Sequence, residues 1–480
     1  MKKFFLVCMV AALTLAVAAP ALAGLKLTSK GRMDVSSIWV SNDVINRPTT
    51  TGNDYDNDDP AAWYQQELVI DPVLHVNEKV KIHARFTIME RLFMGGSGGE
   101  FDANNQGMGV NGDYRDAHNF WVERVWLSFP LFGGTLHVGR MPGGSWAYPW
   151  QNWDANRDRI KYVRKFGHIV MVGLIEKLAE NDAGNFVGAG DQLAFSQSPP
   201  LGYAADGNPY DNNHSDIDAY AVGAIAPFSR NIIWRPLVYY VNFGNSGISG
   251  KGHGYDLLIL NGLMIKAGIF RLDMEINWRN RCWTKFFYDG DEWHDWETSQ
   301  WSGWMEAGLH PGPFSIVAGA FYLQGTRSGH QGTVARNRSL WGVGAEFQPL
   351  LLLFSEDMGI LWNTTGVANG TNGGSGYVGG YLRGAYKIND TMTLSAIVGN
   401  LWADTMYEGT AATDHNGRIY TASRHLGFEA DLAFEWKFMD NLKWVIDLGY
   451  FWAGPFFDNW SRGGPAMDIF GVRNMLVIEW

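Results

Sequence analysis

The sequence predicts an all-β protein, a transmembrane antiparallel up-and-down β-barrel of about 18–20 strands. Extended segments along the chain alternate apolar and polar residues with a period of two. The chain has 22 Trp, 19 Tyr, 27 Phe and 58 Gly, although only 46% of its residues are hydrophobic. The segment 469–480 alternates up to a final aromatic residue, Trp480. A polar lumen behind a lipid-facing aromatic band explains all three observations.

The first 23 residues have the pattern of a secretory signal peptide. Lys2 and Lys3 precede an apolar run over residues 4–19, and an Ala21-Leu22-Ala23 cleavage site follows. The run is too short to cross a bilayer as a helix. We therefore expect residues 1–23 to be removed and residues 24–480 to form a single transmembrane β-barrel domain.

The charge balance argues against nucleic acid as a partner. The formal net charge is −11 for the whole chain and −13 without Lys2 and Lys3, and no basic tract interrupts the sequence. After residue 23, no apolar segment approaches the roughly 18–20 residues that a transmembrane helix needs. One cysteine, Cys282, remains after cleavage, so no intramolecular disulfide is expected.

The first extended segments place apolar residues on one face and basic residues on the other. Residues 24–40 form the first expected strand, and residues 64–76 and 80–92 form a hairpin that turns at Asn77-Glu78. In the second arm, the polar face carries Lys79, Lys81, His83 and Arg85. A basic side chain that faces lipid at the midplane costs roughly 2–4 kcal/mol, so this face is expected to line the lumen.

The segment 119–140 carries a short motif. Gly134, Leu136, Gly139 and Arg140 follow the spacing Gly-x-Leu-x-x-Gly-Arg. Together with the aromatic C-terminus, this resembles the porin superfamily of Gram-negative outer membranes, in which the motif leads into a loop that folds into the pore. The resemblance implies contact with outer-membrane lipid and lipopolysaccharide, and a homotrimer.

By this resemblance, residues 141–158 would be the inward-folding constriction loop. The acids Asp154 and Asp158 would then face bases on the wall, namely Lys81, Arg85, Arg124 and Arg140. Strict alternation puts Arg140 on the lipid side, and Gly139 could relieve this because glycine in a strand often marks a bulge. A Trp-rich loop on the outer surface is an equal alternative.

Strand patterns continue through the middle of the chain, at 159–166, 168–176, 219–226 and 232–243. A hairpin over 255–279 is expected to turn at Asn261-Gly262, a strong turn dipeptide. Its second arm has inward charges of both signs, including Arg271, Asp273 and Glu275. Such a row does not suit a dry core, so an aqueous interior is expected. Residues 280–300 are predicted as an aromatic loop that anchors at the headgroups or guides sugars.

The last third of the chain is the most regular. Expected strands cover 302–309, 314–324, 339–347, 350–362, 378–388, 392–402, 426–438 and 442–452. Inward positions of the segment 426–438 carry acids, which are Glu429, Asp431 and Glu435. Tight turns alternate with long loops, as in barrels with short periplasmic turns and long extracellular loops.

The chain lacks the usual motifs of catalysis and cofactor binding. It has no phosphate-binding glycine loop, no zinc helix, no nucleophile elbow and no haem attachment site. We therefore predict no enzyme activity, no cofactor and no metal site. A rim hydrolase that uses His294-Asp295 or Asp414-His415 is the minor alternative.

The sequence thus predicts a water-filled channel for passive diffusion of small hydrophilic solutes and ions. Basic residues on the N-terminal strands and acidic residues on the C-terminal strands would set an electric field across the lumen if they face each other. The expected pore-lining residues are Lys79, Lys81, His83, Arg85, Arg124, Arg140, Asp154, Asp158, Arg271, Asp273, Glu275, Glu429, Asp431 and Glu435. The alternatives are a selective sugar or carboxylate channel, a barrel sleeve around a multihaem cytochrome, and a soluble secreted β-protein.

Overall fold

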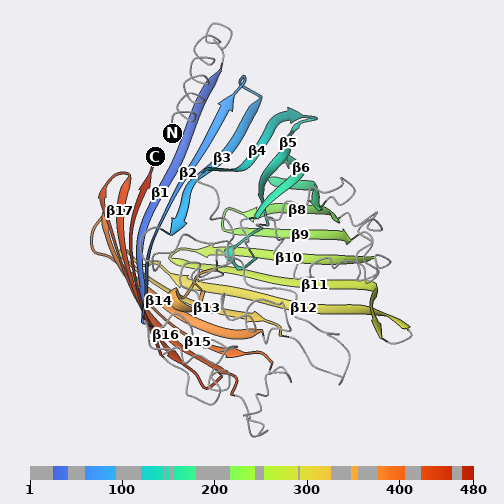
Figure 1. The fold of residues 1–480 in the computed structure, drawn as a ribbon. Helices are drawn as coiled ribbons and strands as arrows, with labels where there is room; N and C mark the ends of the chain where they lie inside the picture. Colours follow the sequence, from blue (N-terminus) through green and yellow to red (C-terminus); the bar gives the residue numbers. More distant parts are fainter. Residues whose placement is uncertain are drawn as a thin grey trace, which may run out of the picture.

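The computed structural model describes residues 25–41, 60–92, 120–144, 146–151, 155–179, 217–243, 253–289, 292–325, 347–354, 376–405, 423–456 and 468–480. Within these ranges the chain forms one sheet of eighteen strands (Figure 1). The strands are β1 (Lys26–Val40), β2 (Ala61–His75), β3 (Lys81–Leu92), β4 (Phe120–Leu131), β5 (Gly134–Gly143), β6 (Ala155–Phe166), β7 (Ile169–Ala179), β8 (Ile217–Ser229), β9 (Ile232–Phe243), β10 (Gly254–Ala267), β11 (Phe270–Asp289), β12 (Glu292–Leu309), β13 (Phe314–Leu323), β14 (Tyr377–Lys387), β15 (Met392–Ala403), β16 (His425–Met439), β17 (Leu442–Ala453) and β18 (Ile469–Glu479).

The sheet closes on itself, which confirms the predicted barrel with eighteen strands. Each strand pairs antiparallel with the next one along the chain, and β1 also pairs with β18. In Figure 1 the first strand accordingly lies beside the red C-terminal end of the chain. Across this seam Trp39 lies opposite Val472. The Trp480 ring covers Gly31, where any Cβ atom would collide with that ring.

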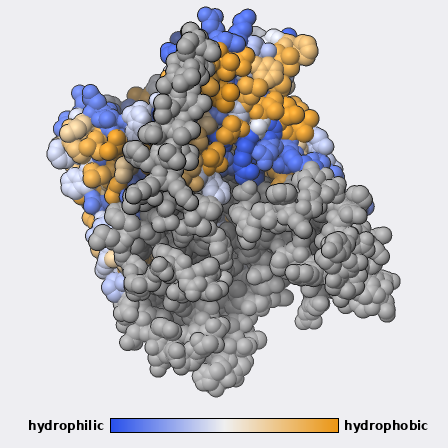
Figure 2. Space-filling model, turned by 45° about the horizontal axis from the view of Figure 1, so that its top comes forward, coloured by the Kyte–Doolittle hydropathy of each residue, from blue (hydrophilic) through white to orange (hydrophobic). Residues whose placement is uncertain are grey.

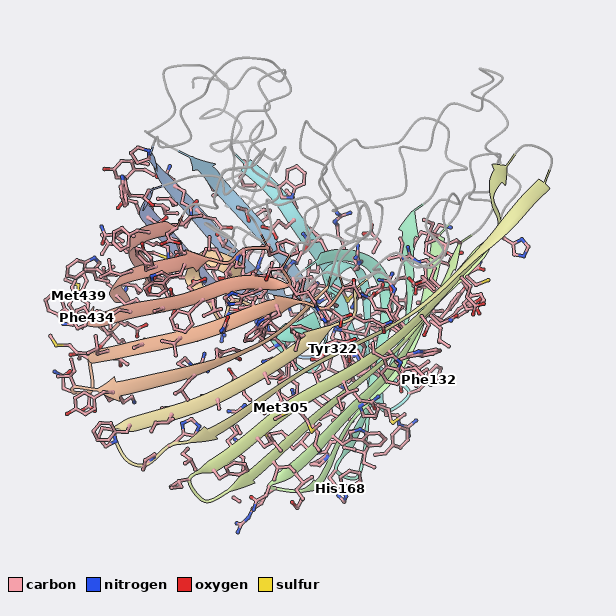
Figure 3. The ribbon with its side chains drawn as sticks, turned by 90° about the horizontal axis from the view of Figure 1, so that it is seen from below. Phe132, His168, Met305, Tyr322, Phe434 and Met439 are labelled. Atoms are coloured by element: carbon pink, nitrogen blue, oxygen red, sulfur yellow. The ribbon has the colours of Figure 1, made fainter. Side chains whose placement is uncertain are left out.

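Side chains alternate between the two faces of the wall. In β10 every second residue from Gly254 to Met264 is buried, and the residues between them are not. The outward face carries large apolar side chains such as Ile175, Val222 and Leu382, each more than half exposed. Figure 2 shows hydrophobic patches on the outer surface between hydrophilic zones, and Figure 3 shows Phe434 and Met439 at the outer edge. An apolar surface of this kind suits lipid rather than water.

Tight turns connect the strands at one end of the barrel. Phe132 and Gly133 join β4 to β5, and both have positive φ (45° and 77°), as a two-residue hairpin turn with the right twist requires. Gly167 and Gly268 also have positive φ, at the turns that follow β6 and β10. The connections at the other end are longer, and most of their residues lie outside the described ranges.

The predicted turn at Asn261-Gly262 is wrong. β10 runs straight through both residues, and the chain turns at Gly268. Gly262 is an inward position, and a Cβ atom built on it would lie 3.1 Å from the Tyr148 ring and closer still to Ala147. The glycine is therefore needed because another segment approaches the wall there, and not because the chain reverses.

The predicted aromatic loop over 280–300 is also corrected. β11 and β12 continue as paired strands to Asp289 and Glu292. In the β11–β12 register Trp283 lies opposite Trp296, and Tyr288 lies opposite Trp293, so the hairpin extends through the predicted loop.

One predicted strand, 350–362, begins instead with a short helix, α2 (Leu351–Phe354), inside the barrel. Leu352, Leu353 and Phe354 are buried by protein, so these consecutive apolar residues have no need to alternate. Residues 339–346 and 355–362 lie outside the described ranges. The described part of the chain contains no helix with the length and apolar character to cross a membrane.

Candidate functional site

One side of the barrel interior, formed by β3 to β6, is rich in basic side chains. Lys81, His83 and Arg85 share the inward face of β3 with Thr87, which is buried. Arg124 on β4 lies directly opposite Arg85 and is 5% exposed. The inward positions of β6 add Arg157, Arg159 and Lys161. We call this set of side chains the basic wall.

Three acids partly balance the basic wall. Asp71 Oδ1 accepts a hydrogen bond from Arg85 Nε at 2.7 Å. Glu123 lies 3.8 Å from Arg124 and accepts a hydrogen bond from Thr87. Glu176 pairs with Arg159 and accepts the Tyr239 hydroxyl at 2.5 Å. The bases outnumber these acids, so the wall keeps a net positive charge.

The structure places three other predicted site residues away from the basic wall. Lys79 lies in the turn before β3, where its backbone N–H donates to Asn77 Oδ1 at 2.9 Å. Arg140 and Asp158 form an ion pair at 3.3 Å on the outward face, shared with Val138 and Ile160. Gly139 has φ +126°, but the β4–β5 register continues through it without a bulge, so Arg140 is not turned inward. Asp154 lies outside the described residues.

Residues 146–151 lie inside the barrel, within the range predicted as the inward-folding loop. The Trp146 indole donates to the Arg235 carbonyl at 3.0 Å, and the Arg235 guanidinium donates to the Ala147 carbonyl at 2.8 Å. Trp150 belongs to the 3₁₀ turn η2 (Pro149–Gln151), is fully buried and donates to Ser302 Oγ at 3.3 Å. These contacts hold the segment against the inner face of β9 and β12.

Residues 347–354, which include α2, form a second segment inside the barrel. The carboxylate of Glu429 on β16 accepts the backbone N–H groups of Leu352 and Leu353 at 2.6 and 3.0 Å. Asp431 accepts the N–H of Leu351 at 3.0 Å. The two carboxylates thus satisfy amide groups that begin a helix, which otherwise have no partner within it. Their function here is to anchor the segment.

The two inserted segments meet each other in the barrel. The Trp150 ring lies edge-on to Phe347, with 4.8 Å between ring centroids, and both rings pack on Phe321 of β13. Phe354 and Tyr377 extend the contact, at 5.5 and 6.0 Å from Phe321. We call residues 146–151 and 347–354, with the wall residues they cover, the aromatic plug.

Most charged positions of β10 and β11 beside the plug are buried, whereas Arg271 is exposed. Arg271 pairs with Asp273 at 2.5 Å, and Glu275 accepts the Asn277 amide at 2.6 Å. Next to them, Asp256 binds Arg279 and Arg281 and is fully buried. The expected aqueous interior is therefore wrong for the buried positions of this sector, which are covered by protein, whereas Arg271 is accessible to solvent. Ion pairing explains how Asp256, Asp273, Arg279 and Arg281 are tolerated there, and Glu275 accepts a hydrogen bond from the neutral Asn277 amide instead.

The acidic side chains of β16 and β17 also have partners within the protein. Asp447 on β17 pairs with Arg473 on β18 at 2.8 Å. Glu435 is half exposed and lies 3.9 Å from Lys443. Glu429 and Asp431 bind the plug, so the predicted acidic wall does not form an open surface opposite the basic wall.

Sequence reasoning predicted an inward-folding loop over 141–158 but missed the second segment of the plug, residues 347–354. It predicted residue 347 as part of a strand and did not single out Trp150. A usable signal was present, since Trp146, Trp150 and Trp153 follow one another between glycines and prolines in a single loop. Among the described residues, no group of His, Cys, Asp and Glu is arranged to hold a metal ion.

Comparisons with known proteins establish the fold. No protein-family model and no curated protein matches the chain. The crystal structure of Pseudomonas aeruginosa OccK8 (OprE) aligns with a TM-score of 0.50 at 10% identity, over 94% of this chain and 98% of that one. The outer membrane protein opdK of the same organism aligns with a TM-score of 0.49 at 11% identity, over the same shares. The chain has the porin barrel fold.

Proposed function

We propose that the chain forms a channel across the outer membrane of a Gram-negative bacterium, with a preference for small hydrophilic anions. The observation that carries this proposal is the basic wall of β3 to β6 inside a closed barrel. Fixed positive charge in a low-dielectric enclosure raises the local concentration of anions and lowers that of cations.

The aromatic plug supports a narrow path rather than a wide one. It occupies the side of the interior formed by β8 to β17, where Trp150, Leu352 and Phe354 are almost fully buried. Solutes would then pass between the plug and the basic wall. This arrangement favours selection by charge and size over general diffusion.

The same fold indicates what contacts the outer and inner surfaces of the barrel. The outward apolar side chains suit outer-membrane lipid, and the interior suits small hydrophilic solutes. The homotrimer and the lack of enzyme activity remain predictions from the sequence.

Reversal potentials in planar bilayers test the charge preference. Under a salt gradient the channel should favour anions, and Lys81→Glu with Arg85→Glu should shift the preference toward cations. Lys79→Glu reverses one charge in a turn outside the basic wall, and it is the matched control for Lys81→Glu and Arg85→Glu tested singly. Equal reversal potentials for the wild type and the double variant would show that Lys81 and Arg85 do not line the conduction path.

General diffusion through a wide pore is the second candidate, as the sequence predicted. The net positive wall alone does not distinguish it from a selective channel. Liposome swelling with sugars of increasing size separates the two. A steep fall in rate between monosaccharides and disaccharides supports the narrow path, and equal rates support general diffusion.

A further inference from the structure

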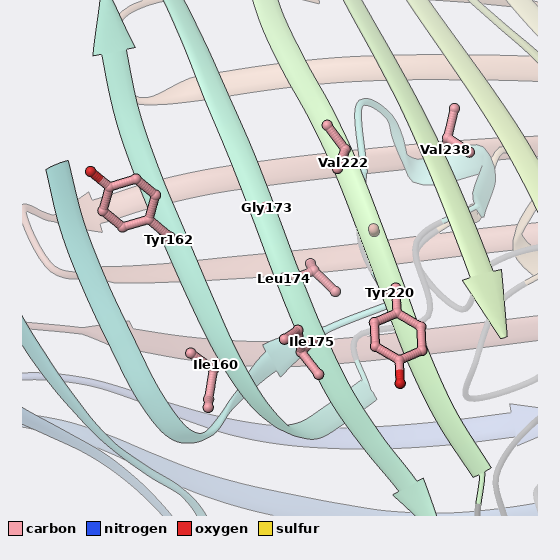
Figure 4. A pocket seen from close by; sticks show the side chains of 9 residues that line it. Ile160, Tyr162, Gly173, Leu174, Ile175, Tyr220, Val222 and Val238 are labelled. Carbon is pink, nitrogen blue, oxygen red and sulfur yellow. The ribbon is translucent and has the colours of Figure 1, made fainter. Parts of the chain in front are cut away.

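One row of inward side chains crosses the six strands β1 to β6 without a carboxylate. Ile160 and Tyr162 line an apolar hollow on the outer surface, so Lys161 between them points into the barrel (Figure 4). Residues that lie opposite each other on neighbouring strands share a face of the sheet. From β1 to β6, the members of the row lie opposite one another in the order Lys26, His75, Lys81, Ser128, His137 and Lys161. We call these six residues the lysine–histidine row.

The row carries positive charge that no acid neutralises. Elsewhere on the basic wall, acids pair with Arg85, Arg124 and Arg159, and Arg157 is buried. None of the three lysines of the row forms an ion pair within the part of the chain that the structure describes. The net charge of the basic wall is therefore concentrated in this row.

The row climbs along the pore. Neighbouring strands lie about 4.8 Å apart, so the row extends for roughly 24 Å across the wall between Lys26 and Lys161. Strands of such barrels are tilted by about 40°, so a line at right angles to them rises about 15 Å along the barrel axis. An anion can therefore pass from one ammonium group to the next without meeting an acid of the row.

We propose that the lysine–histidine row sets the charge selectivity of the channel and that protons on nearby histidines strengthen it. The proposal rests on the proposed anion-preferring channel. His75 lies between Lys26 and Lys81 in the strand registers, and His137 lies opposite Lys161. An unperturbed imidazole gains its proton around pH 6.5. Acidification thus adds positive charge to the row itself.

A third histidine, His83, occupies the next inward position of β3 after Lys81. Its ring stacks on Trp126, with 4.6 Å between the ring centroids. The other two rings bind hydroxyl groups, His75 that of Thr28 at 3.2 Å and His137 that of Ser128 at 2.7 Å. None of these three partners is charged, so none of them neutralises a proton on the rings.

The charges around the three rings are almost all positive. Within two inward positions of a histidine, the strand registers place Lys26, Lys30, Asp71, Lys81, Arg85, Arg124, Arg157, Arg159, Lys161 and Lys165. Asp71 is the one acid of this group of described residues, and both of its oxygens bind Arg85, at 2.7 and 2.9 Å. The turn before β3 adds Glu78 and Lys79, which balance each other.

The size of the effect follows from Coulomb's law. A unit charge about 7 Å from an ion in water changes the local concentration of that ion roughly threefold. The change is an increase for anions and a decrease for cations. The Debye length is about 10 Å at 0.1 M salt, so screening weakens the effect at this distance without abolishing it. We therefore expect the chloride-to-potassium permeability ratio to rise about threefold or more between pH 7.5 and 4.5.

Reversal potentials in planar bilayers under a potassium chloride gradient test the histidines. The wild type should show the rise, and His75→Gln with His83→Gln and His137→Gln should lose most of it. The triple variant keeps every carboxylate, so titration of acids does not explain the difference. His168→Gln is the matched control, because His168 is exposed in the turn between β6 and β7 (Figure 3). His75→Gln alone, at the end of β2, should lose part of the rise.

A second pair of variants tests the lysines at pH 7.5. Lys81→Gln with Lys161→Gln should lower the permeability ratio about threefold or more. Arg85→Gln with Asp71→Asn removes a neutral ion pair and should lower it less. Heat-modifiable mobility on gels would establish that each variant forms a closed barrel.

The outcomes separate the two proposals. A wild type without anion preference at pH 7.5 would overturn the proposed function. A wild type that prefers anions, with an equal rise in the triple histidine variant, would overturn the action of protons on the row. An equal or larger loss on removing the Arg85–Asp71 pair than on removing the two lysines would overturn the row as the selective element.

Discussion

Glu429→Gln should release the second segment of the aromatic plug. In the structure both oxygens of Glu429 accept backbone N–H groups, those of Leu352 and Leu353, at 2.6 and 3.0 Å. A glutamine offers one carbonyl oxygen and one amide group, and the amide group cannot accept an N–H. One of the two helix amides would therefore lose its partner inside the barrel.

The size of the effect follows from that lost bond. A hydrogen bond to a charged group contributes about 1.5–3 kcal/mol, and a buried donor left without a partner costs a similar amount. A change of about 2–3 kcal/mol multiplies the population of the released segment roughly 30-fold to 150-fold. Single-channel records should then show more frequent and longer openings of larger conductance than in the wild type.

The control for this experiment is Glu435→Gln on the same strand. Glu435 is half exposed, lies 3.9 Å from Lys443 and has no contact with the plug. Heat-modifiable mobility on gels would establish that both variants form closed barrels. Identical open probabilities in the Glu429 and Glu435 variants would refute the argument that this carboxylate anchors the plug.

Three further substitutions probe other parts of the structure. Trp150→Ala removes a fully buried ring and should lower the free energy of unfolding by about 3–5 kcal/mol, measured by urea titration in vesicles, while raising conductance. Asp256→Asn leaves two buried guanidinium groups without their counter-charge and should cost about 3–5 kcal/mol in the same titration, with little change in conductance. Gly31→Leu places a side chain where the Trp480 ring lies and should reduce the heat-modifiable fraction of the protein, whereas Gly384→Leu should not.

The sequence predicted most of the barrel wall because lipid and water impose a period of two on every strand. Long alternating runs, such as the one that became β16, were identified with nearly the observed bounds. Alternation also placed Glu429 and Asp431 on the inward face. It could not say whether an inward side chain meets water, an ion or another segment of the chain.

The errors arise where contacts distant in sequence override local preference. Asn261-Gly262 has the composition of a hairpin turn. In the structure, however, Gly262 lies within a strand, where the lack of a side chain leaves room for Ala147 and Tyr148. The run Leu351–Phe354 has the composition of a buried strand, but the carboxylates of β16 hold it as a helical turn. In both cases the deciding partner lies more than 70 residues away, so no local pattern could reveal it.

The seam between β1 and β18 imposes an order on assembly. β1 obtains its second neighbour only when β18 has been synthesised, and Gly31 and Trp480 come together across almost the whole length of the chain. Contacts between such distant residues form slowly because a long loop must close first. Until then two edges with unpaired backbone groups are exposed, and any factor that shields those edges would protect the nascent protein from aggregation.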